Sequence, residues 1–123
     1  MTRSILDPDT LVIVAVKEAS VAAFAIMIYR EKSAHLNLLA VKPKHRRFGI
    51  GKILIEWLEL SALNAGTFQL PLEVRENNRA AQTFYASLGY TQGKVIPGYY
   101  RNTEAAMRMT KNLSILSNSH PGV

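Results

Sequence analysis

The chain has 123 residues, enough for one small domain with a hydrophobic core, and 48% of them are hydrophobic, which excludes a disordered chain. It contains no cysteine, which excludes disulfides, thiolate metal sites and a cysteine nucleophile, and we expect no metal site. The net charge of +6 favours an anionic partner such as a phosphorylated cofactor. No apolar run is long enough to cross a bilayer and the N-terminus lacks a signal-peptide pattern, so we expect a cytoplasmic protein without a membrane partner.

Three apolar runs follow a short N-terminal segment that shows no periodicity. They extend from Leu11 to Val16, from Val21 to Tyr29 and from Ala34 to Val41, and each has the length of a strand. Short polar links join them, as in hairpins. This pattern predicts three strands in an antiparallel meander.

A basic loop that contains two glycines leads from the third strand into a helix. The sequence from Val41 to Lys52 is Val-Lys-Pro-Lys-His-Arg-Arg-Phe-Gly-Ile-Gly-Lys, and apolar residues at helical spacing continue from Ile50 to Asn64, before Gly66. The N–H groups in the first turn of a helix have no partner within the helix, and glycine lets an anion approach them closely. With the basic side chains, this predicts a phosphate-binding loop; a turn with a solvated basic rim is the alternative.

A strand is predicted next, from Phe68 to Val74. The order strand, helix, strand implies a parallel pairing with a right-handed crossover. Alternation along this strand places Phe68, Leu70, Leu72 and Val74 on one face and Glu73 on the other. Pro71 has no N–H to donate, so we expect the strand to lack a close neighbour on that side at this point.

A second helix follows, and either Asn77 or Asn78 can cap its start. Its apolar stripe consists of Ala81, Phe84, Tyr85 and Leu88, and Gly89 ends it. Two more strands are predicted, from Tyr90 to Ile96 and from Ala105 to Leu113. We therefore assign residues 1–113 to a single domain and residues 114–123, which are rich in Ser, Asn, Pro and Gly, to a C-terminal tail.

Several motifs resemble the GNAT superfamily of acyl-CoA N-acyltransferases. Arg46-x-x-Gly49-x-Gly51 resembles its acyl-CoA pyrophosphate loop. The sequence Leu72-Glu73-Val74-Arg75-x-x-Asn78-x-x-Ala81-x-x-x-Tyr85-x-x-Leu88-Gly89-Tyr90, together with Tyr99-Tyr100 and Met107-x-Met109, is similar to the RimI-type protein N-terminal acetyltransferases. The resemblance implies an α/β (α+β) mixed sheet with the GNAT fold, lacking most of the usual N-terminal strand and helices.

The resemblance also implies roles for individual residues. In the RimI type, a glutamate at the position of Glu73 is the proposed general base and a tyrosine at the position of Tyr85 the general acid. Tyr99 and Tyr100 would line the entry of the acceptor. The residues implied to hold acetyl-CoA are Leu39, Ala40, Val41, Arg46, Arg47, Phe48, Gly49, Ile50, Gly51, Lys52, Asn78, Ala81 and Tyr85.

Each of these residues also has a plainer interpretation. Glu73 can be a solvated charge, Tyr85 a core tyrosine and Asn78 a helix cap. Tyr99 and Tyr100 can simply cover the core. His35 is available as a base, but a histidine in a strand is more often structural.

The start of the chain departs from the family pattern. Roughly ten residues precede Leu11, where the family has a strand and two helices that form one wall of the acceptor site. The edge of the first strand would also be open to pairing with another chain. A second subunit in a homodimer would supply the wall; otherwise the acceptor site is unusually open, or catalysis is lost. Ala105 also stands where the RimI type usually has an acidic residue.

The sequence therefore predicts an N-acetyltransferase that moves an acetyl group from acetyl-CoA to a primary amine, with a protein N-terminal α-amine as the favoured acceptor. A free α-amino group has a pKa of about 8, so a weak base suffices for it, whereas a lysine at about 10.4 is almost wholly protonated at pH 7. A small-amine or lysine acetyltransferase and a catalytically silent acyl-CoA-binding module are the alternatives. Nucleic acid is not expected as a partner, because aromatic residues are not interleaved with the basic ones.

Overall fold

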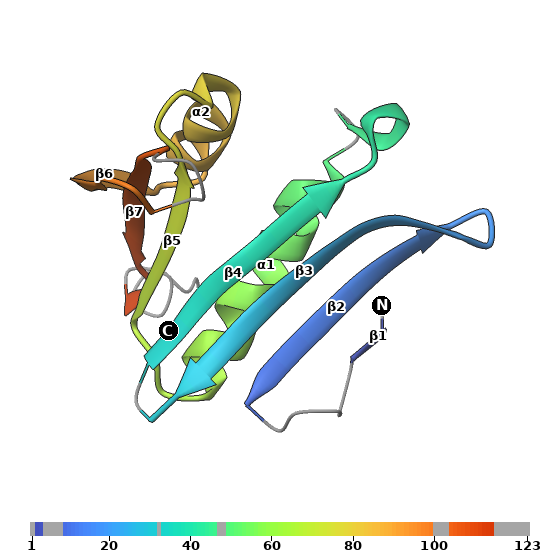
Figure 1. Cartoon of the computed structure of the whole chain (residues 1–123). Coiled ribbons are helices and arrows are strands. Elements are labelled where there is room, and N and C mark those ends of the chain that lie inside the picture. The colour runs from blue at the N-terminus through green and yellow to red at the C-terminus, as the bar shows by residue number, and fades with distance from the viewer. Residues whose placement is uncertain (1, 4–8, 32, 47–48, 100–103, 115–123) are drawn as a thin grey trace.

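A computed structural model describes residues 2–3, 9–31, 33–46, 49–99 and 104–114. In this part of the chain, seven strands form one mixed sheet in the order β1-β2-β3-β4-β5-β7-β6, and two α-helices pack on it (Figure 1). The elements are β1 (Thr2–Arg3), β2 (Thr10–Lys17), β3 (Ser20–Arg30), β4 (Ser33–Val41), the 3-10 helix η1 (Pro43–His45), α1 (Ile50–Asn64), β5 (Gln69–Arg75), α2 (Arg79–Ser87), β6 (Thr91–Ile96) and β7 (Ala106–Asn112). The mixed α/β class predicted from the sequence is confirmed.

The antiparallel meander predicted for the first half is confirmed. β2 pairs with β3, with Leu11 opposite Met27, and β3 pairs with β4, with Met27 opposite Leu36. The β2–β3 hairpin turns at Glu18 and Ala19, which both have positive φ, of 52° and 61°. Two positive φ angles in a two-residue loop match the right-handed twist of the strands that it joins.

The open outer edge predicted for the first strand is corrected in part. Thr2 and Arg3 form β1 and pair with Val14 and Ile13 of β2. A strand of two residues is too short to leave an alternating pattern in the sequence, and its pairing uses backbone groups that every residue carries. This is why periodicity did not find it.

The parallel strands β4 and β5 separate from each other along their length. The only pairing between them in the described residues joins Leu36 to Leu72, next to Pro71. Figure 1 shows the two strands diverging toward their C-terminal ends, where η1 and α2 begin. Pro71 itself lies beside this one pairing and stands opposite Thr110 of β7, so the lack of a close neighbour predicted at Pro71 stays a prediction.

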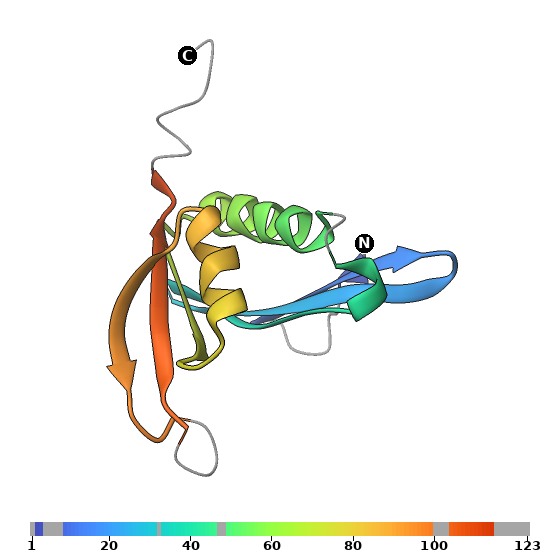
Figure 2. The same ribbon diagram turned by 90° about the horizontal axis from the view of Figure 1, so that it is seen from above.

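The core lies between the sheet and the two helices, which share one side of it (Figure 2). Alternation assigns each strand's apolar residues to this side, so that Ile13, Met27 and Leu72 pack against Leu54 and Leu58 of α1 within the same buried cluster. The helix Ile50–Asn64 has the predicted bounds. Its apolar residues cover more than the sheet-facing side, because Ile53, Trp57 and Leu60 are exposed. Phe68, predicted with the inward-facing residues, precedes β5 and is also exposed.

No described helix or strand covers the other side of the sheet, which faces the viewer in Figure 1. The residues that alternate with the core residues there are also apolar, and they are half-buried: Val12, Val14, Phe24, Ile26 and Ile28. No described helix has the length and hydrophobicity needed to span a membrane.

Candidate functional site

A cavity of about 730 Å³ lies where β4 and β5 have separated, between the start of α1 and the start of α2. Eleven of the thirteen residues predicted to hold the cofactor line it: Leu39, Ala40, Val41, Arg46, Gly49, Ile50, Gly51, Lys52, Asn78, Ala81 and Tyr85. Arg47 and Phe48, the other two, lie outside the described residues. The structure adds Ala80 and Phe84 to the lining.

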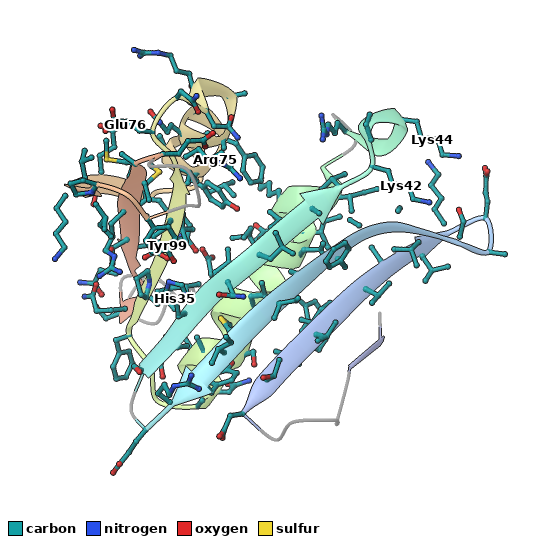
Figure 3. All side chains as sticks on the ribbon, viewed as in Figure 1. His35, Lys42, Lys44, Arg75, Glu76 and Tyr99 are labelled. Carbon is teal, nitrogen blue, oxygen red and sulfur yellow. The ribbon has the colours of Figure 1, made fainter. Side chains whose placement is uncertain are left out.

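The basic loop presents the start of α1 to this cavity. Gly49 is the N-cap residue and has a φ of 76°, a conformation that residues with a Cβ rarely adopt. No described side chain caps the helix, and no acidic residue lies in its first turn. Arg46 is held by a bond of 3.1 Å from its Nε to the carbonyl oxygen of Val41. Free N–H groups and two cations, Arg46 and Lys52, therefore meet at one end of the cavity. Lys42 and Lys44 do not line the cavity, and Figure 3 shows them on the side of η1 that faces away from α2.

Gly51 has a packing role that the sequence did not reveal. A Cβ at this position would lie 3.1 Å from the ring of Phe84 and 3.6 Å from Val41. The missing side chain thus lets α1 approach α2 closely. The signal for Phe84 was present in the sequence as a member of the apolar stripe of the second helix, but that stripe does not distinguish the core from a cavity wall.

The edge of β4 that faces β5 forms another wall. Beyond Leu36, no described residue of β5 pairs with β4, whereas Leu39 and Val41 still pair with β3 on the other edge. The backbone groups that point toward β5 are therefore not used by a ladder with that strand. This wall can hydrogen-bond an extended ligand much as a missing strand would.

Asn78 and Tyr85 come from α2. Asn78, rather than Asn77, caps the helix, since its Oδ1 accepts a hydrogen bond of 3.0 Å from the N–H of Ala81. Tyr85 is buried, and its ring packs edge-on against Tyr90 with centroids 5.7 Å apart. Burial raises the pKa of the Tyr85 hydroxyl to about 12, because desolvation disfavours the phenolate. The phenol therefore keeps its proton at neutral pH.

Glu73 does not line the cavity but lies on the other face of β5, as alternation predicted. Its side chain is only 3% exposed, and both carboxylate oxygens are bonded. Oε1 contacts His35 Nε2 at 2.5 Å and accepts a bond of 3.1 Å from the Tyr99 hydroxyl. Oε2 accepts bonds from Arg108, at 2.9 Å from Nε and 2.8 Å from Nη2. The interpretation of Glu73 as a solvated charge is thus wrong.

Sequence reasoning found only part of this cluster. The sequence offers His35 as a base while favouring a structural role for it, and it does not single out Arg108. The register brings them together, because Glu73 stands opposite Arg108 on β7 and next to the pair Leu36–Leu72 that joins β5 to β4. Figure 3 shows His35 and Tyr99 on the uncovered side of the sheet, in front of β4 and β5. Tyr100 lies outside the described residues.

The cavity, lined by two cations and two glycines, lies on one face of the sheet, and the carboxylate cluster of Glu73 lies on the other. A sequence model described as an acetyltransferase (GNAT) domain matches residues 8–92, which is more than half of the chain. The chain belongs to the GNAT acetyltransferase family. Among the described residues of this GNAT domain, no cluster of His, Asp or Glu could hold a metal ion.

Several characterised or named relatives are similar to this GNAT chain. A ribosomal protein bS18 alanine N-acetyltransferase of Escherichia coli is 36% identical over 72% of the chain and 60% of its own length. An uncharacterised N-acetyltransferase of Methanocaldococcus jannaschii is 40% identical over 64% of the chain and 51% of its own length. The crystal structure of the ribosomal-protein-S18-alanine N-acetyltransferase from E. coli has a TM-score of 0.79 at 30% identity, covering 95% of this chain and 76% of that one. The chain thus spans about half to three fifths of the curated relatives it matches.

Proposed function

We propose that this GNAT chain transfers an acetyl group from acetyl-CoA to a primary amine, and that the favoured acceptor is a protein N-terminal α-amine. The observation that carries the proposal is the cavity at the separation of β4 and β5, which combines the uncapped start of α1 with a free strand edge and the protonated phenol of Tyr85. Acetyl-CoA needs an anion site for its phosphates, backbone groups for its extended arm and a proton donor near its thioester, in this order along its length.

The cofactor half of the proposal assigns the pyrophosphate of acetyl-CoA to the loop from Arg46 to Lys52. There, the N–H groups of the first turn of α1 and the two cations attract anionic oxygens. The pantetheine arm would bond to the free edge of β4 at Leu39 to Val41. Asn78 and Ala81 would contact the same arm from α2. Acetyl-CoA supplies the acetyl group, activated as a thioester.

The chemical half of the proposal divides the work between the two faces of the sheet. Attack by an amine needs a group that accepts its proton, donors that stabilise the oxyanion, and a proton for the departing thiolate. A free N–H on the β4 edge suits the oxyanion. Tyr85 lines the cavity with its proton in place and suits the sulfur. Glu73, whose carboxylate is held by His35 and Arg108, is the proposed general base.

An N-terminal amine is favoured over a lysine because its pKa is about 8, so that a modest base neutralises enough of it at pH 7. The E. coli relatives named above acetylate a ribosomal protein, which is consistent with such an acceptor. As part of the proposal, we expect the protein to act in the cytoplasm, where ribosomal proteins are made. We also expect a homodimer to cover the half-buried apolar side chains on the uncovered side of the sheet.

The test is acetyl-CoA binding by calorimetry, followed by thiol release with a panel of N-terminal peptides, lysine peptides and small amines. Release that depends on an N-terminal peptide supports the proposal. Release with lysine or small amines alone would move the assignment to those acceptors. Binding without release from any acceptor would indicate a silent acyl-CoA-binding module. Sedimentation over a range of concentrations checks the dimer.

A further inference from the structure

Arg108 lies beside Glu73 on the uncovered side of the sheet, and only part of its guanidinium is used there. It stands opposite Glu73 in the β5–β7 ladder, and its Nε and Nη2 lie 2.9 and 2.8 Å from Oε2 of Glu73. A guanidinium carries five N–H groups in a rigid fork, and this contact uses one edge of it. Among the described residues, no other acceptor contacts Arg108, and its side chain is 39% exposed. Donors on the other edge are therefore available to a ligand.

The contact with Glu73 also fixes the orientation of this guanidinium. Glu73 is itself held in place, because its side chain is only 3% exposed and its other oxygen, Oε1, contacts His35 and accepts a hydrogen bond from Tyr99. An arginine that is already ordered loses little side-chain entropy when it binds a ligand. Its planar fork matches the two oxygens of a carboxylate. The free edge of Arg108 is thus suited to a carboxylate.

A bulge in β6 lies opposite Arg108 and adds a second cation. The register between β6 and β7 shifts at this point, so that Gly93 and Lys94 together stand opposite Arg108. Val95, the next residue, pairs with Met107, which packs against the core. Alternation therefore places the exposed Lys94 on the other face, which is that of Arg108. Bulges are frequent beside functional sites, where they redirect a side chain.

The charges on this part of the sheet do not cancel. On this face, the strands β5, β6 and β7 carry the cations Arg75, Lys94 and Arg108 and the acid Glu73. Glu104 pairs with Arg75 and Glu73 pairs with Arg108, so that among the described residues the charge of Lys94 is left unbalanced. A surface with a positive surplus attracts an anionic group and repels a second cation.

We propose that Arg108 binds a carboxylate that the acceptor carries close to its amine, and that the enzyme therefore selects acidic acceptors. The inference rests on the proposed function and names its substrate class. An amine that gives its proton to Glu73, directly or through one water, comes within roughly 6–8 Å of Arg108. The carboxylate of Asp or Glu at the second residue of an N-terminal peptide lies at about this distance from the α-amine. A free amino acid carries the same two groups closer together.

The experiment compares two N-terminal peptides that differ only at their second residue, which is Asp in one and Asn in the other. Thiol release gives kcat/KM for each peptide with the wild type, Arg108→Lys and Arg108→Met. We expect the wild type to favour the Asp peptide by about 10- to 100-fold, the range for a hydrogen-bonded charge pair. Arg108→Met should bring this ratio to within about 2-fold of one, and Arg108→Lys, which keeps the charge without the fork, should give an intermediate ratio.

The ratio separates recognition of a carboxylate from a merely structural role. Loss of the contact with Glu73 lowers stability or turnover for both peptides alike, whereas loss of carboxylate binding lowers kcat/KM for the Asp peptide only. Arg75→Met is the matched control, because it removes a cation from the same face of β5 and should leave the ratio unchanged. A wild-type ratio near one, or a ratio that Arg108→Met leaves unchanged, would overturn the inference.

Two further measurements distinguish this failure from a failure of the proposed function. Thiol release with free aspartate or glutamate alone, lost in Arg108→Met, would support the carboxylate site and identify an amino acid rather than a protein as its source. If the wild type releases no thiol with any acceptor, the proposed function fails, and calorimetry of the two peptides with the CoA-loaded protein decides the inference by itself. Tighter binding of the Asp peptide that depends on Arg108 supports the inference, and equal binding of the two peptides contradicts it.

Discussion

On one side of the sheet, two helices bury a continuous core and the cavity opens between them; on the other side, apolar residues of β2 and β3 and the Glu73 cluster face outward without a described covering element. On the first side, the two helices cover the sheet and bury the core. The second side carries the polar contacts around Glu73, but no described helix or strand covers them. Under the proposed function, binding of the cofactor would depend on local features of one loop and one strand edge, whereas binding of the acceptor would depend on groups that three strands bring together.

The two sides also differ in how they hold charge. Arg46 and Lys52 line the cavity, where we propose that they bind the pyrophosphate of acetyl-CoA. Glu73, in contrast, is neutralised within the protein by Arg108 and contacts His35. Changes on the helix side should therefore affect ligand binding first, and changes on the uncovered side should affect transfer or stability first.

The largest expected effect is at Gly49. Gly49→Glu places a carboxylate at the uncapped start of α1, where it repels the pyrophosphate, and should weaken acetyl-CoA binding by ~1000-fold, which is about 4 kcal/mol. Gly66→Glu is a matched control, because Gly66 also has positive φ and open space around it but lies at the other end of the helix. Calorimetry checks both variants, and equal loss of affinity would contradict the loop assignment.

The next effect is on stability at alkaline pH. The pKa of Tyr85 is raised by burial from about 10 in the unfolded chain to about 12 in the fold. The folded state therefore favours the neutral phenol, so this contribution is complete below pH 10 and is lost as the pH rises toward 12. The loss amounts to about 1.4 kcal/mol per pH unit, or about 2.7 kcal/mol in total.

Tyr85→Phe cannot ionise and should show a shallower decline in the free energy of unfolding between pH 10 and 12, measured with urea. Some decline should remain, since burial also raises the pKa of Tyr90, with the charge of Glu59 adding to the effect. Identical slopes for the wild type and Tyr85→Phe would show that this phenol is solvated in the fold.

A smaller effect is expected for the ion pairs, and it separates a buried carboxylate from an exposed one. Arg108→Met removes two contacts from the enclosed Glu73 and should lower the free energy of unfolding by about 2 kcal/mol. Arg75→Met removes the pair with Glu104, in which both side chains are about half exposed, and should change it by less than about 1 kcal/mol. Urea denaturation of the two variants gives the comparison; a larger loss for Arg75→Met would reverse it.

Much of the helix side could be predicted from the sequence because its signals are local. The bounds of α1 follow from apolar spacing between two glycines, and eleven of the predicted cofactor residues line one cavity because they lie in two short motifs. Phe84 was not predicted to line the cavity, because a core residue and a residue of a cavity wall have the same spacing along a helix. The strand β1 was not predicted, because two residues are too few to show an alternating pattern.

The uncovered side could be predicted only in part, since its contacts are between strands. Alternation gave the face of Glu73, but its partners depend on the register of β5 with β4 and β7, which no local pattern fixes. Met107-Arg108-Met109 alternates in a way that places Arg108 on the polar face, and this was the one available signal. His35 needed the single pairing between Leu36 and Leu72 to bring it beside Glu73.

The smallest expected effect lies at the β2–β3 turn, far along the chain from both motifs. Ala19 has a φ of 61°, which strains a residue with a Cβ, so Ala19→Gly should raise the free energy of unfolding by about 0.5–1 kcal/mol. Ala86→Gly, an exposed change in α2, should lower the free energy of unfolding by up to about 1 kcal/mol. In a helix glycine relieves no backbone strain, and it loses more conformational entropy on folding than alanine does. Thermal unfolding of both variants tests the opposite signs, and acetyl-CoA affinity should be the same in the wild type and Ala19→Gly. A loss of affinity in Ala19→Gly would mean that the turn communicates with the cavity, which would break the separation between the two sides of the sheet.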